Sequence, residues 1–203
     1  MAACLACTNH QKVLVDNITY QNIYGSDGWS WLLWCSNVFG LVARGLWATN
    51  FYDGIWLDGG CCQCSLGPGA LVAQQTNGYA PRSIAIEPSG ASAPGCTNIT
   101  FDDWTLLQCC GFFAEPYGVG PRLANIKFSK VFQRQTQWPF GTSSHAACEL
   151  YGCDNVVVED WNTDCMWIEL QACNTNINVV FLRPYAAPLD QGAANLNIEA
   201  HGS

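Results

Sequence analysis

Asn98–Trp104 reads NITFDDW, and its pattern returns downstream in Asn125–Val131 (NIKFSKV) and Asn155–Trp161 (NVVVEDW). Each copy opens with asparagine and then alternates apolar and variable residues with a period of two, which is the pattern of a β-strand. The chain is therefore predicted to repeat one strand-containing unit. Three further segments align with these copies: Asn17–Ile23 (NITYQNI) without a gap, and Asn37–Ala43 (NVFGLVA) and Asn176–Leu182 (NINVVFL) more loosely.

A second motif, in which an apolar-variable-apolar run ends in an acid, lies between the asparagine-led strands. Its copies are Ile55–Asp58 (IWLD), Ile84–Glu87 (IAIE), Phe112–Glu115 (FFAE), Ala146–Glu149 (AACE) and Met166–Glu169 (MWIE). Units of about 20 to 34 residues that repeat along a chain are typical of a solenoid. We therefore predict an all-β fold, a single-stranded parallel β-helix of about six to seven coils over residues 12–183. Residues 1–11 are predicted to form an N-terminal cap. Residues 184–203 are predicted to form an extended tail, which covers the open end or reaches onto a neighbouring subunit.

Several of the thirteen cysteines occupy a repeated place. Cys35, Cys96 and Cys153 each lie two residues before an asparagine-led strand, and Cys173 lies three before one. This placement favours a column of small buried thiols inside the coil. The alternative is a set of disulfides, because stacked strands lie about 4.8 Å apart, within reach of a bridge between neighbouring coils. A further group could supply four thiolates to zinc, but its spacing matches no familiar zinc site and a cap or loop role is preferred: Cys4, Cys7, Cys61, Cys62 and Cys64.

The acids of the second motif are the candidate ligand-binding residues. Stacking in register would place them in one line, and two like charges about 5 Å apart in water repel by roughly 0.8 kcal/mol. A bound cation would relieve this repulsion, so Ca²⁺ is the one candidate cofactor, and the line would bind a cation or a glycan. The alternative is a solubilising row whose side chains splay apart. The residues are Asp58, Glu87, Glu115, Glu149 and Glu169.

A second polar row comes from the asparagine-led strands. Asp103, Lys130 and Asp160 occupy the same offset in three copies. An acid-base-acid ladder across stacked strands is favourable, so this row is expected to set the register and not to perform chemistry.

Composition narrows the classes of partner. Hydrophobic residues make up 49% of the chain and charged residues 12%, which is typical of a fold whose strands are buried or covered by neighbouring subunits. The net charge is −8 and no basic cluster exists, so phosphate contacts with nucleic acid or an anionic membrane are not expected.

No stretch has the roughly 20 uncharged apolar residues of a membrane span. Met1–His10 lacks the basic start and apolar run of a secretory signal. The nine tryptophans point to contacts with glycans or subunits.

The asparagine-led strands and the coil length resemble the right-handed parallel β-helix superfamily, which contains pectate lyases, polygalacturonases and phage tailspikes. The resemblance covers residues 12–183, implies a right-handed coil and selects no single member. Polygalacturonases carry an N-T-D strand followed by paired aspartates, a G-H-G and an R-x-K. This chain has Asn162-Thr163-Asp164, but Asp102-Asp103 precedes it, His201 stands in Ala-His-Gly, and there is no R-x-K. Pectate lyases use calcium carboxylates with an arginine, and arginine is scarce here.

These observations favour a non-catalytic structural or adhesive module in a virion or outside the cell. A spike, fibre or decoration subunit, a filament or an adhesin would fit, with self-association or assembly neighbours as partners and a glycan as ligand. The alternative is a lyase or hydrolase acting on acidic polysaccharide, because inverting hydrolysis needs only two carboxylates about 6.5–9.5 Å apart. Its candidate catalytic residues are Asp103, Asp160 and Glu169.

Overall fold

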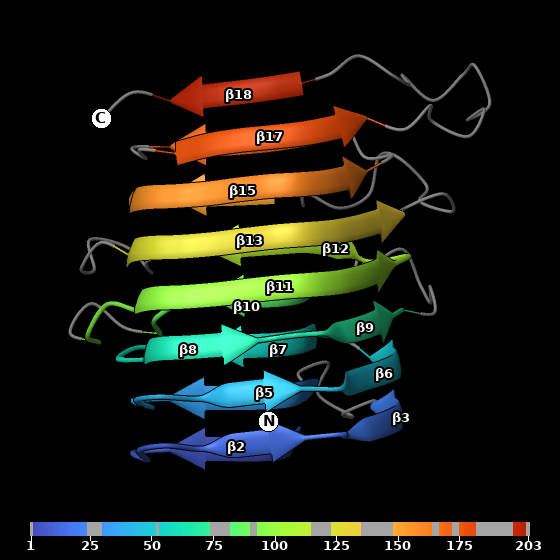
Figure 1. The fold of residues 1–203 in the computed structure, drawn as a ribbon, viewed down its shortest axis with the longest axis vertical. Helices are drawn as coiled ribbons and strands as arrows, with labels where there is room; N and C mark the ends of the chain where they lie inside the picture. Colours follow the sequence, from blue (N-terminus) through green and yellow to red (C-terminus); the bar gives the residue numbers. More distant parts are fainter. Residues whose placement is uncertain are drawn as a thin grey trace.

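The described residues form a parallel β-solenoid. The computed structural model describes residues 2–23, 30–51, 53–73, 82–89, 93–114, 123–134, 148–163, 167–171, 175–181 and 197–201. Within them every regular element is a β-strand, and the strands build two all-parallel sheets of eight and ten strands. The chain alternates between the two sheets, so that successive strands stack in chain order over about six coils (Figure 1). The predicted fold class is confirmed.

Each coil contributes strands to both sheets. The eight-stranded sheet contains, in spatial order, β1 (Ala2–Thr8), β4 (Ser30–Ser36), β7 (Asp53–Leu57), β10 (Arg82–Ile86), β12 (Cys110–Ala114), β14 (Cys148–Tyr151), β16 (Trp167–Gln171) and β18 (Asn197–His201). The ten-stranded sheet contains β2 (Leu14–Asp16), β3 (Thr19–Ile23), β5 (Val42–Arg44), β6 (Leu46–Phe51), β8 (Cys62–Leu66), β9 (Gly69–Val72), β11 (Thr97–Leu107), β13 (Leu123–Arg134), β15 (Cys153–Thr163) and β17 (Thr175–Phe181).

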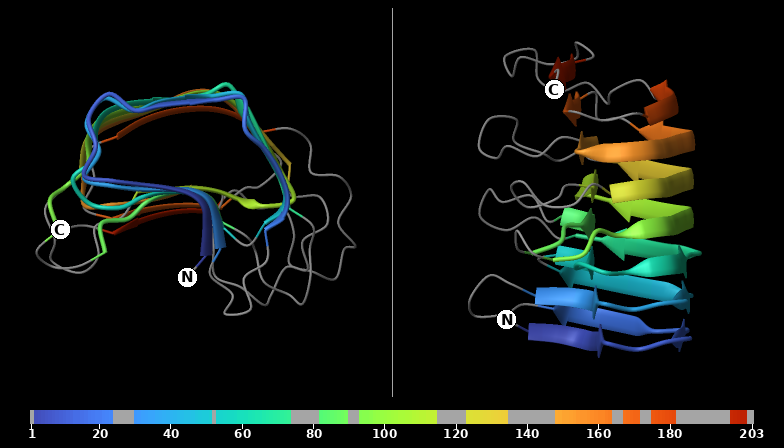
Figure 2. Two further views of the ribbon diagram at one scale, coloured as in Figure 1. Left: turned by 90° about the horizontal axis from the view of Figure 1, so that it is seen from below. Right: turned by 90° about the vertical axis from the view of Figure 1, so that its left-hand side faces the viewer.

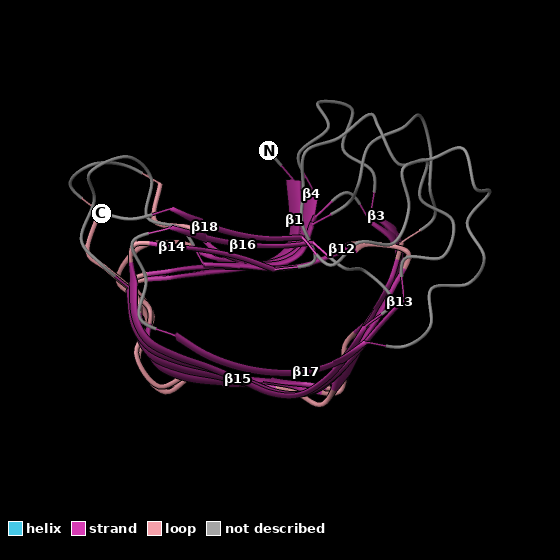
Figure 3. Ribbon diagram, turned by 90° about the horizontal axis from the view of Figure 1, so that it is seen from above, coloured by secondary structure: helices cyan, strands magenta, loops and turns pink. Residues whose placement is uncertain are grey.

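Viewed along its axis, the stack has a flatter eight-stranded sheet facing an arched ten-stranded sheet (Figures 2 and 3). β1, β2 and β3 lie at one end, and β17 and β18 lie at the other (Figure 1). β1 falls within residues 1–11 and pairs with β4, and β18 falls within residues 184–203 and pairs with β16. The strand ladder therefore reaches into both segments that were predicted to flank it.

The asparagines that open the repeated strands form a corner of the coil. Asn98, Asn125 and Asn155 have φ angles of 55°, 55° and 54°, in the left-handed region that asparagine tolerates better than most residues. Their carboxamides form a ladder: Asn125 Nδ2 donates to Asn98 Oδ1 at 3.1 Å, and Asn155 Nδ2 donates to Asn125 Oδ1 at 2.8 Å. The predicted register of these three strands is confirmed.

Three other asparagines do not belong to this corner. Asn37 (φ 54°) lies at the corner that leaves the eight-stranded sheet, where its Nδ2 donates to Asn9 Oδ1 at 2.7 Å. Asn17 (φ 54°) lies at a third corner, where its backbone N–H donates to the carbonyl of Arg44. Asn176 pairs with Val157, two positions beyond the corner. The alignment of these three with Asn98 was therefore wrong. For Asn17 and Asn37 the reason is that several corners impose the same left-handed backbone and select the same residue, whereas Asn176 is paired within β17.

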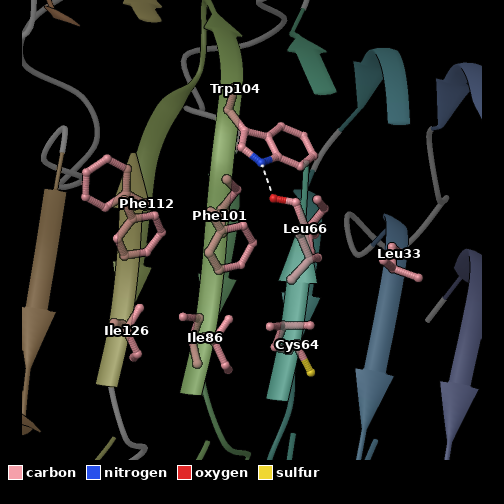
Figure 4. Packing of buried hydrophobic residues seen from close by; sticks show 14 of the residues in the cluster. Leu33, Cys64, Leu66, Ile86, Phe101, Trp104, Phe112 and Ile126 are labelled. Carbon is pink, nitrogen blue, oxygen red and sulfur yellow. Dashed lines mark hydrogen bonds between the residues drawn. The ribbon is translucent and has the colours of Figure 1, made fainter. Parts of the chain in front are cut away.

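Alternate residues of the strands fill the coil interior. Phe128 stacks between Phe101 and Phe112, with ring centroids 5.1 Å and 4.1 Å away, and all three rings are fully buried. Trp104 turns its indole into the same core, where Nε1 donates to the carbonyl of Leu66 at 3.1 Å (Figure 4). The repeated apolar positions thus form one continuous core along the stack.

A second, smaller cluster accounts for further tryptophans. Trp31, Trp56, Ala85 and Phe113 pack together apart from the main core, and the Trp31 and Trp56 ring centroids are 4.6 Å apart. Phe113 follows the inward-facing Phe112, so this cluster lies on the outer face of the eight-stranded sheet.

Candidate functional site

The predicted acidic line divides into separate register positions. Asp58 and Glu87 follow the paired residues Leu57 and Ile86 and occupy corresponding positions. Glu115 lies outside the described residues. Glu149 pairs with Phe113, and Glu169 pairs with Glu149, so both stand two positions earlier along their strands. The alignment of the last two motifs with the first three was therefore wrong. A shift of two residues keeps the same face inward, so the apolar pattern alone does not detect it.

Asp58 and Glu87 are both engaged by their own chain. Asp58 is buried, and its Oδ1 accepts backbone N–H groups from Gly59 and Ser89 at 2.7 Å each. The Ser89 hydroxyl donates to both carboxylate oxygens at 3.0 Å. Glu87 Oε2 lies 2.9 Å from Arg82 Nη1 in a largely buried ion pair. These contacts hold the turns that follow β7 and β10. Asp58 and Glu87 therefore have a structural role.

Replacing Asp58 by asparagine is expected to lower the free energy of unfolding by about 1–2 kcal/mol, because a charged acceptor of several hydrogen bonds is lost. Urea unfolding measures the change. Asp16→Asn is the matched control, since its ion pair with Arg44 is solvent-exposed and is expected to contribute less than about 0.5 kcal/mol. Millimolar Ca²⁺ should leave this comparison unchanged. Stabilisation of the wild type by Ca²⁺ that disappears in Asp58→Asn would instead make Asp58 a cation ligand.

The register places Glu149 opposite Glu169, as the motif alignment predicted, and adds a third glutamate, Glu199, that the sequence analysis did not include. Glu149, Glu169 and Glu199 are paired on the adjacent strands β14, β16 and β18. The side chain of Glu149 is 5% exposed. Glu199 was overlooked because it falls in the segment predicted to be a tail. Within the described residues, no group of three or more His, Cys, Asp and Glu side chains is arranged to hold a metal ion.

Asp103, Lys130 and Asp160 form the predicted second row. Their neighbours Asp102, Ser129 and Glu159 pair across β11, β13 and β15, which confirms the register. All three are exposed and have φ angles between 52° and 61°, so they make a corner of the coil. Glu169 lies in the other sheet, on β16. The register therefore does not bring Glu169 together with Asp103 and Asp160.

Ion pairs along this part of the ten-stranded sheet run from coil to coil. Lys130 Nζ lies 3.3 Å from Asp102 Oδ2, and Lys127 pairs with Glu159. The hydroxyl of Ser129, followed by the ammonium of Lys130, holds the pKa of Asp102 below its ordinary value. The charges of this face therefore help to specify which residues stack.

An exposed surface along the ten-stranded sheet was not anticipated. One register position runs through β3, β6, β9, β11, β13 and β15, and we call it the outer strip: Thr19, Trp47, Ala70, Thr105, Phe132 and Asn162. Trp47 and Phe132 are each 40% exposed, and Trp47 is the one exposed tryptophan among those whose side chains are described. The Arg134 guanidinium carbon lies 4.2 Å from the Phe132 ring centroid. The strip thus carries two exposed rings with one hydrogen-bonding side chain, that of Thr105, between them.

No protein family model, curated protein or solved structure matches this chain.

The outer strip joins residues that are far apart in the sequence. In sequence, Trp47 and Phe132 lie in dissimilar segments, and nothing in their spacing links them. The cue that was present is alternation: Trp47 follows buried Leu46 and Phe132 follows buried Val131, so each is an aromatic residue at an outward position. The described part of the chain has no helix of the length and hydropathy that crossing a bilayer requires.

The cysteines form two columns inside the coil and not one. Cys35 pairs with Cys7 and Leu57 in the eight-stranded sheet. Cys96 and Cys153 share a position of the ten-stranded sheet, with Leu123 between them. All of these cysteines are buried as free thiols, and burial is the main cause that raises the pKa of Cys35 above its ordinary value. Cys173 lies outside the described residues. The prediction that these thiols are buried inside the coil is confirmed, but the single column is wrong, because Cys35 lies in the other sheet and Leu57 and Leu123 interrupt the two stacks.

Proposed function

We propose that the chain is a non-catalytic structural module of a virion or extracellular assembly, and that it binds a glycan along the outer strip. A spike, fibre, decoration subunit or adhesin would use such a module. The observation that carries the proposal is the placement of exposed Trp47 and Phe132 at one register position of the ten-stranded sheet.

The spacing of the two rings suits an extended ligand. They are separated by three coil steps of about 4.8 Å, or about 14 Å along the stack. A sugar ring presents an apolar C–H face that stacks on an aromatic ring, and its hydroxyls need hydrogen-bonding partners beside that ring. Thr105 lies between the rings, and Thr49 and Arg134 lie two residues further along their strands. A linear oligosaccharide aligned with the solenoid axis would contact both rings.

The polar groups described above support a structural module over an enzyme. Asp58 and Glu87 are held by backbone N–H groups, a hydroxyl and an ion pair within the chain. Asp103 and Asp160 stand at an exposed corner with Lys130 between them. The resemblance to the superfamily that includes phage tailspikes is compatible with this function, and that superfamily also holds the lyases and hydrolases that form the alternative.

Binding to immobilised neutral and acidic polysaccharides tests the proposal. Trp47→Ala and Phe132→Ala should each weaken binding about tenfold, which corresponds to about 1.4 kcal/mol of lost stacking. Val42→Ala is the matched control, because Val42 is an apolar residue with similar exposure, 44%, on the same sheet but outside the strip. Equal binding by all variants would contradict the assignment of the strip. Release of reducing or unsaturated sugars by the wild type would contradict the non-catalytic function.

A further inference from the structure

Two buried thiols lie directly opposite each other at the end of the stack. Cys7 of β1 and Cys35 of β4 are paired residues of the parallel ladder. Such residues lie about 4.8 Å apart, within the 4.4–6.8 Å between Cα atoms that disulfides span. Both side chains belong to the main core and are 7% and 0% exposed. They are free thiols in the structure.

We propose that Cys7 and Cys35 are a modification site, at which a small organic disulfide such as cystine closes an intrachain bridge between the first two coils. This inference is independent of glycan binding, because neither residue lies on the outer strip.

The position of β1 distinguishes this pair from the other thiols. A disulfide needs its Cβ atoms about 3.5–4.5 Å apart, so one strand has to move slightly toward the other. β1 is the first strand of the eight-stranded sheet, and the one described strand beside it is β4. It can therefore move slightly toward β4. Cys61 and Cys96 also lie at corresponding positions, but the strand β11 that follows Cys96 is held between β8 and β13.

Access to solvent selects the same pair. Cys7 is 7% exposed, whereas the buried thiols Cys61, Cys64 and Cys96 are 0%, 2% and 0% exposed. Cys4 and Cys62 are more exposed than Cys7, but neither has a cysteine opposite it on the neighbouring strand. A thiol has to be reached by the oxidant as its thiolate, so among the thiols that have a second thiol opposite them, Cys7 is expected to react first. The inner thiols are expected to stay reduced while the protein is folded.

The reaction consists of two thiol–disulfide exchanges. The Cys7 thiolate attacks one sulfur of cystine, which forms a mixed disulfide and releases one cysteine thiolate. The Cys35 thiolate then attacks the Cys7 sulfur, which forms the Cys7–Cys35 bond and releases the second cysteine. The two protons lost by the protein are taken up by the two released thiolates, and the two electrons lost by the protein dithiol reduce cystine.

The bridge would fasten the strand at the open edge of the sheet. An edge strand with unpaired backbone groups frays easily and can pair with another chain. Linking β1 to β4 would keep the first coil closed. Amide hydrogen exchange in residues 2–8 should therefore become slower after oxidation and return to its original rate after reduction.

Peptide mapping tests the proposal directly. The folded protein is treated with cystine, the remaining thiols are alkylated in denaturant, and the chain is digested with trypsin. Cleavage after Lys12 and Arg44 gives one peptide with Cys4 and Cys7 and another in which Cys35 is the sole cysteine. The expected product is the 1–12 peptide linked to the 13–44 peptide, and fragmentation should place the bond on Cys7.

Cys7→Ala should abolish this product, while Cys4→Ala, an exchange on the same strand and in the same peptide, should retain it. A bond placed on Cys4, or a linked product that survives in Cys7→Ala, would overturn the proposal. Recovery of Cys7 and Cys35 in their alkylated form after exhaustive treatment with cystine would also overturn it. The wild-type map decides between these outcomes even if a variant fails to fold.

Discussion

Phe128→Ala is expected to lower the free energy of unfolding by about 3–5 kcal/mol, the range for removing a large aromatic side chain from a packed core. The ring of Phe128 stacks on Phe101 and Phe112 and is fully buried. Phe101 and Phe128 belong to neighbouring coils, and Phe112 belongs to the opposite sheet. The cavity left by the exchange would therefore remove packing contacts among three strands at once.

Equilibrium unfolding in urea measures this effect, and Phe132→Ala is the matched control. Phe132 lies on the same strand, four residues further on, but it is 40% exposed and its described ring contact is with Arg134. Its removal should cost no more than about 1 kcal/mol. Similar losses for the two variants would mean that the strand does not present these residues to opposite faces.

Asn125→Ala is expected to lower the free energy of unfolding by about 2–3 kcal/mol. Alanine at φ 55° carries the left-handed penalty of about 1–2 kcal/mol. The exchange also removes the carboxamide that links Asn98 to Asn155, and each such hydrogen bond contributes about 0.5–1.5 kcal/mol, toward the lower end at an exposed site.

Asn125→Gly separates these two contributions, because glycine tolerates the left-handed backbone but lacks the carboxamide. It should recover most of the backbone penalty and leave a loss of about 1 kcal/mol. Thermal and urea unfolding of the three proteins provide the comparison. Equal free energies of unfolding for Asn125→Ala and Asn125→Gly would contradict a left-handed corner at this position.

The fold was predictable because its decisive features are local. Period-two alternation in Asn98–Trp104 and its copies marks strands, and repetition at coil length marks a solenoid. The identity of each corner was less accessible. Asn17, Asn37 and Asn98 satisfy the same backbone requirement at three different corners, so residue type alone does not tell them apart.

The candidate site was harder to predict because it depends on register. A two-residue shift moved Glu149 and Glu169 away from Asp58 and Glu87 without changing which side chains face inward. The outer strip was missed for a related reason. Trp47 and Phe132 become neighbours on a surface only when the coils between them are stacked in the right register.

Proton–proton contacts in a multidimensional NOESY spectrum of the labelled protein test the parallel, in-register stacking most directly. Backbone contacts should link Ile99 to Ile126 and Ile126 to Val156, while Ile99 and Val156, two coils apart, show none. Antiparallel contacts among these strands, or contacts that place Asn98 and Asn125 at different positions, would contradict the solenoid and every surface assigned from it.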